Sequence, residues 1–423
     1  MKVPWNISAA GFFRSLLSQG EGLASSKPGG PITLYGTCYA ILGLHFLGED
    51  EPVMDNVRRF VTSAQDSESG LLIGPELVGF EAAPGVMHDR GHLLMHLTCS
   101  VLPFCQQFSI QLKHPIFEAH KFCDQSYLEQ WMKSRNWRHA WFEGNNILFV
   151  GQLLVYLRDT EMHPGAGAAL DSWFQWLDRT MDPATGLWGT NGFCSPMEAV
   201  YGGYHQLLVY YHQNHLLPHI RGLVDTVLKL QHYDGGFNPN GNAGACEDVD
   251  SVDILIHCYK RLDYRRAEIR HALRRCLRHI LATQNPDGGF PYSRDWPQTH
   301  MGIPGTDAAP NVSCSFPTWF RIHTLALIAE VLPGEPALHG VPFRFSNALG
   351  MGWHQSPDGW SVVSPAATLE ERVLEGLHQL RIAKHCGRNH LRTIKRAGLR
   401  VLSKTGLSVG SSRKPVSGTP SHN

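Results

Sequence analysis

A cluster of acidic residues near the middle of the chain has the residue types and spacing needed for proton chemistry. Residues 246–255 read CEDVDSVDIL, so Asp250, Asp253 and His257 stand at positions i, i+3 and i+7. On a helix this spacing puts the three side chains on one face. A carboxyl group held protonated by neighbouring charge and poor solvation can donate a proton. Asp250 is therefore the candidate acid, and Asp248 and Asp253 are its candidate partners. The alternative is that these acids cap the first turn of the helix.

A histidine cluster precedes an apolar stretch earlier in the chain. His88 is followed by His92 and His96, whose four-residue spacing suits either a metal-binding pair or packed side chains. The chain has 24 histidines, so chance clusters are common. We therefore place His88 among the candidate substrate-binding residues, and the sequence predicts no metal site and no cofactor.

Two neighbouring amides open another apolar run. Asn145 and Asn146 can cap a helix, or Asn145 can neutralise a substrate carboxylate. The second role needs a base nearby. Tyr201, Tyr204 and His205, which begin a later apolar run, are the candidates for that base.

Aromatic residues gather at residues 314–323, which read CSFPTWFRIH. Phe316 and Trp319 could form the walls of a cavity, where their ring faces would stabilise a cation. The alternative is that they belong to the core, because their spacing is helical.

These candidate residues lie between copies of a repeated turn. Residues 231–237 (QHYDGGF) and 284–290 (QNPDGGF) match closely, and 355–360 (QSPDGW) and 182–188 (DPATGLW) are related. Weaker candidates are 65–72 and 141–144. Asp and Gly favour a tight turn with left-handed backbone, and the aromatic residue packs the turn onto its neighbour.

Helical patterns fill the segments between the turns. Leu223, Val227 and Leu230 form an apolar stripe before one turn, and residues 252–262 form a second apolar helix after it. A single helical hairpin cannot bury its apolar face, so several must stack. The sequence thus predicts an all-α fold of stacked hairpins, either as a closed ring or as an open solenoid.

The repeated Gln-x-x-x-Gly-x-Phe/Trp turn resembles the repeat of terpenoid (squalene) cyclases and, more loosely, of protein prenyltransferase beta subunits. The resemblance covers about residues 60–365. It implies a single α/α toroid of the (α/α)6 type, with inner helices around a central cavity. The first residues of the inner helices would then line one mouth of that cavity.

The acidic cluster resembles the Asp-x-Asp-Asp motif of cyclases that are started by protonation. The resemblance implies that Asp250 is the proton donor and Asp248 the first acid of the motif, while Ser251 occupies the place of the last acid. The Cys-x-x-x-x-Trp pattern from Cys314 resembles the zinc-cysteine region of prenyltransferases. Val312 stands where that family has an aspartate, so we expect no zinc there.

Composition limits the kinds of partner. Lys plus Arg and Asp plus Glu both total 37, so the formal charge is zero, which argues against a nucleic-acid partner. The ten cysteines form no CxxC pair, which favours free thiols and a cytoplasmic location. We find no convincing signal peptide and no apolar run of membrane-spanning length.

The ends of the chain differ from its middle. We expect a lead-in over residues 1–30, the toroid over 31–375, a basic amphipathic helix over 376–408 and a disordered tail over 409–423. A basic amphipathic helix can lie on an anionic membrane surface, or it can be an ordinary solvated helix.

Three functions stay open from the sequence. The first is cyclisation of an isoprenoid or other lipid substrate started by Asp250, with His257 on the same helical face. The second is a carbohydrate-active toroid, either a polysaccharide lyase or a glycosidase. The third is a toroid that binds a partner without catalysis. The polarity of the cavity distinguishes the first two, because isoprenoids need an apolar wall and sugars a polar one.

Overall fold

In the computed structural model the chain is helical, and the prediction of an all-α toroid is confirmed. The structure describes residues 4–18, 21–50, 55–81 and 87–354, together with a few positions between 373 and 380. Among these residues the only extended pairings are isolated bridges. Residues 1–371 form one compact unit, and the description below concerns that unit.

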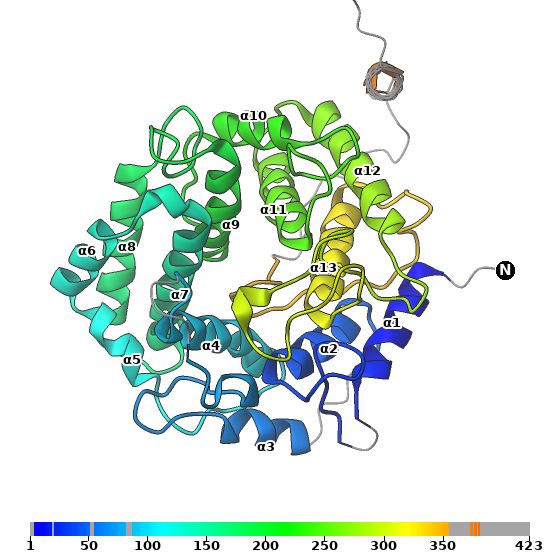
Figure 1. Ribbon diagram of the computed structural model, residues 1–423. Helices are drawn as coiled ribbons and strands as arrows, with labels where there is room; N and C mark the ends of the chain where they lie inside the picture. The colour runs from blue at the N-terminus through cyan, green and yellow to red at the C-terminus, as the bar shows by residue number, and fades with distance from the viewer. Residues whose placement is uncertain are drawn as a thin grey trace, which may run out of the picture. The chain divides into compact units, whose positions relative to one another are not determined.

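Two concentric layers of helices form the ring (Figure 1). The inner layer consists of α2 (Leu34–Phe46), α4 (Arg90–Gln107), α7 (Ala140–Asp159), α9 (Pro196–His212), α11 (Ala245–Arg261) and α13 (Ser315–Val331). Each inner helix packs on the next, and α13 packs back on α2, so the ring is closed. The outer layer consists of α1 (Trp5–Leu16), α3 (Asp55–Ser63), α5 (Phe117–His120), α6 (Gln125–Lys133), α8 (Ala166–Thr180), α10 (Ile220–Leu230) and α12 (Arg266–Ala282). Short 3-10 turns complete the chain path: η1 (Pro75–Leu77), η2 (Lys121–Cys123), η3 (Trp137–His139) and η4 (His300–Gly302).

The two layers differ in their pattern of burial. Every residue of α2 is buried, as expected for a helix covered on all sides. The outer helix α10 instead buries one stripe, which includes the predicted Leu223, Val227 and Leu230. Inner helices are therefore buried over most of their surface, and outer helices carry the amphipathic pattern that the sequence shows most clearly.

The repeated turns join neighbouring hairpins through one glutamine side chain each. The Gln231 amide donates to the carbonyl oxygens of Gly235 and Ala272, both at 2.8 Å, the latter in the next outer helix. Gln65 makes the same pair of bonds, to Gly70 at 2.9 Å and His114 at 2.7 Å. The turn at 65–72, which we expected to be weak, therefore has the full geometry of the repeat.

The turn at 284–290 closes the outer layer. Gln284 donates to the carbonyls of Gly288 and Trp5, both at 2.9 Å. Gly288 has φ +90°, and a Cβ there would lie 2.0 Å from the carbonyl oxygen of Ser8. Because α1 packs on α2 and receives this turn, the N-terminal segment is an outer helix of the ring and not a lead-in.

Two other expectations have different outcomes. Residues 141–144, proposed as a weak turn, form the first turn of α7, so that prediction was wrong. The turn predicted at 355–360 lies outside the described residues, as does most of the basic helix expected over 376–408 and all of the tail over 409–423.

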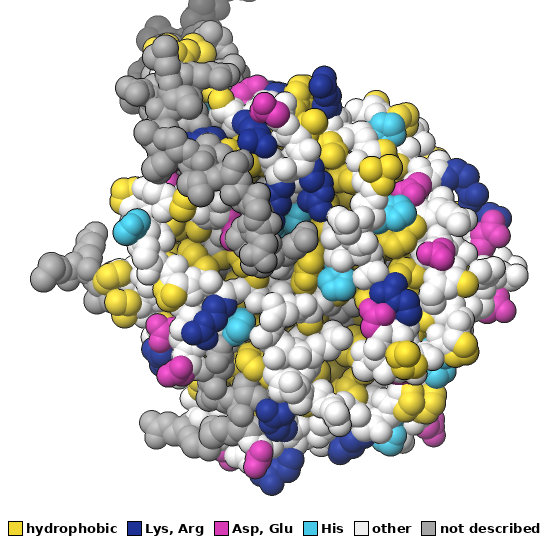
Figure 2. All heavy atoms as spheres, turned by 180° about the vertical axis from the view of Figure 1, so that it is seen from behind, with side chains coloured by type: hydrophobic (Ala, Val, Ile, Leu, Met, Phe, Trp, Pro, Cys, Tyr) yellow, Lys and Arg dark blue, Asp and Glu magenta, His cyan; other side chains and the backbone are white. Residues whose placement is uncertain are grey.

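The surface charges, the cysteines and the helix lengths can each be compared with what the composition indicated. On the face seen in Figure 2, outside the grey atoms, basic and acidic side chains are interspersed. The cysteines among the described residues are free, and most of them are buried. None of the described helices is both long and apolar enough to cross a membrane.

Candidate functional site

A cavity of about 420 Å³ opens where the inner helices begin. Its wall takes residues from the first three turns of α4, α7, α9, α11 and α13, together with the segment between α12 and α13. The inner helices thus place their first residues around one mouth, as the toroid resemblance implies. Predicted site residues on this wall are His88, Asn145, His205, Asp250 and Phe316.

Asp250 is the acidic group with the most unusual environment on this wall. It is buried, and neither carboxylate oxygen has a hydrogen-bond partner among the described residues. Burial, followed by the nearby charges of Glu247, Asp253 and Asp248, raises the pKa of Asp250 well above its ordinary value. Burial therefore favours the neutral carboxyl group, which is the form that can donate a proton into the cavity.

His205 is a residue of this wall that can accept a proton. Its Nδ1–H donates to the carbonyl oxygen of Tyr201 at 2.8 Å, which leaves the lone pair on Nε2. Burial lowers the pKa of His205 to about 4, so the imidazole is neutral at physiological pH. A neutral imidazole and a carboxyl group with a raised pKa therefore line the same cavity, from α9 and α11 respectively.

Asp248 has a different environment, and its contacts resemble those of residues in other repeats. Its Oδ1 accepts from the backbone N–H of Phe237 at 2.8 Å, just as Thr318 accepts from Phe290 and Thr98 from Leu72, each at 2.9 Å. Its other oxygen is paired with the buried guanidinium of Arg321. Asp248 does not line the cavity, and its contacts anchor the turn before α11.

The two candidate tyrosines of α9, Tyr201 and Tyr204, also differ in their hydrogen bonds. The Tyr201 hydroxyl donates to the carbonyl oxygen of Phe237 at 2.6 Å, so it joins α9 to a turn. The Tyr204 hydroxyl is buried without a hydrogen-bond partner among the described residues. Trp319 stacks on Tyr39, with ring centroids 4.9 Å apart. The cavity wall includes neither Tyr201 nor Tyr204. It also excludes Tyr39 and Trp319, so Trp319 belongs to the core.

Asp253 lies one helical turn after Asp250 on α11, and His257 lies one turn after Asp253. Both are therefore nearer the C-terminal end of the helix. Both are fully buried, and burial raises the pKa of Asp253 to about 8. They form a separate cluster with His354, which follows α13 in the chain. Asp250, Asp253 and His257 therefore share one helical face, as their spacing predicts. However, Asp250 lines the cavity, whereas Asp253 and His257 belong to the cluster with His354.

Several residues of the cavity wall were missed from the sequence. Trp141 and Phe142 stand one turn before Asn145 and Asn146, so the helical spacing could have found them. The segment between α12 and α13 contributes Tyr292 and residues 297–301 to the wall. No periodic pattern marks this segment, because its backbone is irregular and η4 contains left-handed residues.

The charge of the wall is distinctive. The described residues that line the cavity include the carboxyl groups of Asp250 and Glu198, and they include no lysine or arginine. Histidines supply much of the remaining polarity: His88, His96, His139, His205 and His300. Burial lowers the pKa of His300 to about 4 and also lowers that of His96 well below its ordinary value, so these rings are neutral at physiological pH.

Comparisons with known proteins do not show a family for this chain. No protein-family model matches it, and no curated protein matches it. A solved structure titled as a polysaccharide lyase aligns with 78% of this chain and 90% of its own, at 11% sequence identity and a TM-score of 0.39. A likeness at that level assigns no function to this chain.

Proposed function

We propose that this protein is a carbohydrate-active enzyme that cleaves a glycosidic bond in the cavity at the start of the inner helices. The observation that carries the proposal is that Asp250 and His205 line one mixed wall, where burial raises the pKa of Asp250 and lowers that of His205. Polar groups alternate there with the rings of Trp141, Phe142 and Phe316. Aromatic faces beside hydrogen-bonding groups suit a sugar, which has an apolar face and a polar rim.

The reaction that these groups support is acid–base cleavage. Asp250 donates its proton to the leaving glycosidic oxygen, while Nε2 of His205 takes a proton from the attacking water. Asn145 lines the same wall and offers an amide for substrate hydroxyl groups. Because the described wall lacks basic side chains, the proposal favours a neutral or amino-substituted sugar over a uronate.

The test uses the full chain and a panel of neutral, amino-substituted and uronate oligosaccharides, with products followed by mass spectrometry. Hydrolysis adds one water to the products, whereas a lyase leaves an unsaturated sugar that absorbs ultraviolet light. We expect Asp250→Asn and His205→Gln each to lower kcat/KM by about 100-fold or more. Asp263→Asn, at a carboxylate that is 92% exposed, is the matched control and should keep wild-type turnover. Wild-type rates in both cavity variants would contradict the proposal.

A second candidate is cyclisation of an isoprenoid, the function that the turn resemblance implies. It is favoured by the five aromatic rings of the wall, Trp141, Phe142, Tyr292, Phe316 and Phe320, which accompany Asp250 and its raised pKa. Ring faces stabilise the carbocation that protonation would create. Its products would be isomers of the substrate, with no water added. Asp250→Asn would remove either activity, but only bond cleavage needs His205 as the base.

A further inference from the structure

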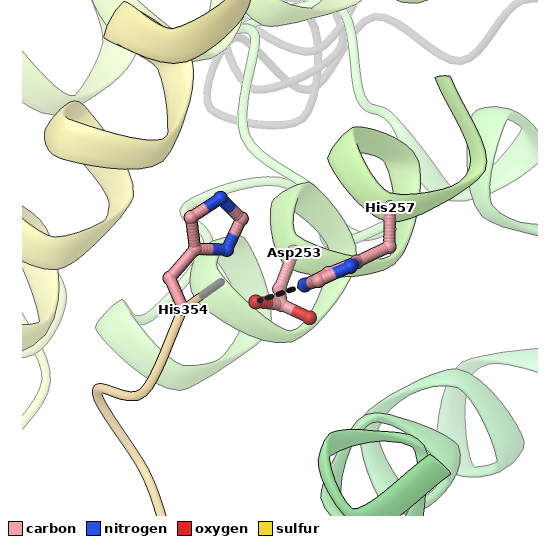
Figure 3. A group of neighbouring side chains, drawn as sticks. All are labelled: Asp253, His257 and His354. Atoms are coloured by element: carbon pink, nitrogen blue, oxygen red, sulfur yellow. Dashed lines mark ion pairs between the residues drawn. The ribbon is translucent and has the colours of Figure 1, made fainter. Parts of the chain in front are cut away.

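A second cluster of titratable residues lies away from this cavity wall, further along α11. Asp253, His257 and His354 are all buried, and each offers one ligand atom within 4.8 Å of the others. Two come from successive turns of α11, and the third comes from the segment that follows α13 (Figure 3). The cluster therefore joins two parts of the chain that are about 100 residues apart.

The inner atoms of this cluster have the character of ligand atoms. Nε2 of His257 lies 3.8 Å from Oδ2 of Asp253 and has no hydrogen-bond partner among the described residues. Neither oxygen of Asp253 has one either. A buried carboxylate and imidazole are costly to leave without a hydrogen bond, so residues placed in this way point to a ligand between them.

The surroundings hold the donors in place. The ring of Tyr211 stacks on His257 with centroids 3.7 Å apart and planes inclined by 12°. Figure 3 shows His354 approaching Asp253 from the side opposite His257, with one ring nitrogen toward the carboxylate. The two imidazoles thus lie on either side of the carboxylate, with one ligand atom of each residue within 4.8 Å of the others.

We propose that Asp253, His257 and His354 bind a divalent transition-metal ion, most suitably Zn²⁺. Two imidazoles and one carboxylate are a donor set that zinc prefers, and three protein ligands leave a position for water or substrate. Donors of a tetrahedral zinc site lie about 3.3 Å apart, given bonds of about 2.0 Å. The distances here are somewhat longer, so binding needs a small inward rotation of the side chains.

A second cavity, at the end of the ring opposite the first, reaches one residue of the cluster, His354. His354 and Glu330 line this cavity, of about 680 Å³, together with residues of α13 and of the segment after it. Glu330 Oε2 lies 3.6 Å from Nε2 of His354. An ion could therefore reach the cluster from this end, independently of any substrate in the first cavity.

Two cationic side chains lie against the histidines of the cluster and oppose metal binding. Their positions suggest a variant that should bind the metal more tightly. Arg261 Nη1 lies 3.0 Å from Nδ1 of His257, and Lys260 Nζ lies 3.0 Å from Nε2 of His354. An arginine only donates, so this contact places the His257 proton on Nε2, which the ion must displace. Arg261 is partly exposed and already lies over the ring of Tyr211, 4.9 Å from its centroid, so it can turn away from His257. Removing its charge should therefore strengthen metal binding.

The test measures metal binding directly, without activity. The full chain is stripped with a chelator and titrated with Zn²⁺ by calorimetry, and Co²⁺ is added separately to record its visible spectrum. We expect one ion per chain, an absorption spectrum of tetrahedral Co²⁺, and binding about tenfold tighter or more for Arg261→Met. Asp253→Asn and His354→Gln should each weaken Zn²⁺ binding by at least about 10- to 100-fold.

The matched control is His92→Gln, a buried histidine of α4 whose Nε2 also has no hydrogen-bond partner among the described residues. It should bind Zn²⁺ like the unaltered chain. Circular dichroism checks that each variant is folded, and the Co²⁺ spectrum of the unaltered chain remains informative if a variant is not. The proposal is overturned if neither the unaltered chain nor Arg261→Met binds one Zn²⁺. It is equally overturned if folded Asp253→Asn binds as well as the unaltered chain.

Discussion

At the scale of single residues, neighbouring carboxyl groups on α11 have acquired different properties from different contacts. Asp248 is held by the N–H of Phe237 and by Arg321, whereas Asp250 has neither kind of partner among the described residues. Glu247 accepts from the N–H of Gly244, and burial raises its pKa to about 7. Because the charged form of Asp250 is poorly solvated, this residue is the natural proton donor of the group.

The pH dependence of stability tests this assignment. The pKa of Asp250 is raised in the folded chain, so the stability associated with its neutral form is complete below its unfolded pKa of about 3.9. That stability is lost as pH rises through the interval up to the folded pKa. We therefore expect the unfolding free energy of Asp250→Asn to fall less than that of the unaltered chain between about pH 5 and pH 8.

Urea unfolding at both pH values measures this difference. Asp253, whose pKa is also raised, is present in both proteins, so the difference between them reports Asp250 and its interaction with Asp253. Asp263→Asn, at an exposed carboxylate, should behave like the unaltered chain. Identical pH dependence in Asp250→Asn and the unaltered chain would show that Asp250 is ionised in the fold.

At the scale of the elements, the mouth of the cavity depends on how closely α7 and α9 cross. A Cβ on Gly202 would lie 2.1 Å from the carbonyl oxygen of Ala140, and one on Gly144 would lie 2.2 Å from that of Gly202. These contacts are with backbone, which cannot move aside without moving the helix. The two glycines therefore set the separation of the helices that carry Asn145 and His205.

Gly202→Ala should push these two helices apart. Overpacking of this kind costs about 1–3 kcal/mol or more, and it should also weaken substrate binding in the cavity. Gly11→Ala, in the middle of outer helix α1, is the matched control, because a Cβ there meets nothing within 4 Å. It should stabilise the protein by about 0.5–1 kcal/mol through helix propensity. Thermal and urea unfolding measure both, and equal effects of the two substitutions would refute the crossing argument.

At the scale of the whole ring, the N-terminal helix and the segment after α13 hold the closure together. The indole N–H of Trp5 donates to the carbonyl oxygen of Ala337 at 2.6 Å, and its ring stacks near Phe343. The backbone N–H of Ser315, at the start of α13, donates to the carbonyl oxygen of Ser26 at 2.7 Å. Closure thus depends on contacts between residues about 300 positions apart in sequence.

Trp5→Ala should lower the stability of the ring measurably. The loss should be below the about 3–5 kcal/mol of a fully buried tryptophan, because Trp5 is partly exposed. Trp296→Ala removes a tryptophan that is 68% exposed and should change the unfolding free energy by no more than about 0.5 kcal/mol. Denaturant unfolding compares them, and equal losses would mean that Trp5 does not contribute to closure.

The local sequence was sufficient to predict the helical faces and the positions of the turns, because these depend on residues close together in the chain. Helical periodicity predicted the stripe of α10 and the shared face of Asp250, Asp253 and His257, because side-chain direction along a helix repeats regularly. The glutamine and glycine turns predicted where inner helices begin, and therefore that Asp250 lies at a mouth.

Only the tertiary structure decided what surrounds each side chain. Asp248 is anchored because Arg321, 73 positions away, reaches it, and His354, from the segment that follows α13 in the chain, lies within reach of Asp253. The wall segment at 297–301 likewise has no pattern that places it in the cavity. Burial and charge, which determine whether a carboxyl group is an acid, an anchor or a ligand, depend on residues distant in sequence. Helical spacing fixes the direction of a side chain, but not what packs against it.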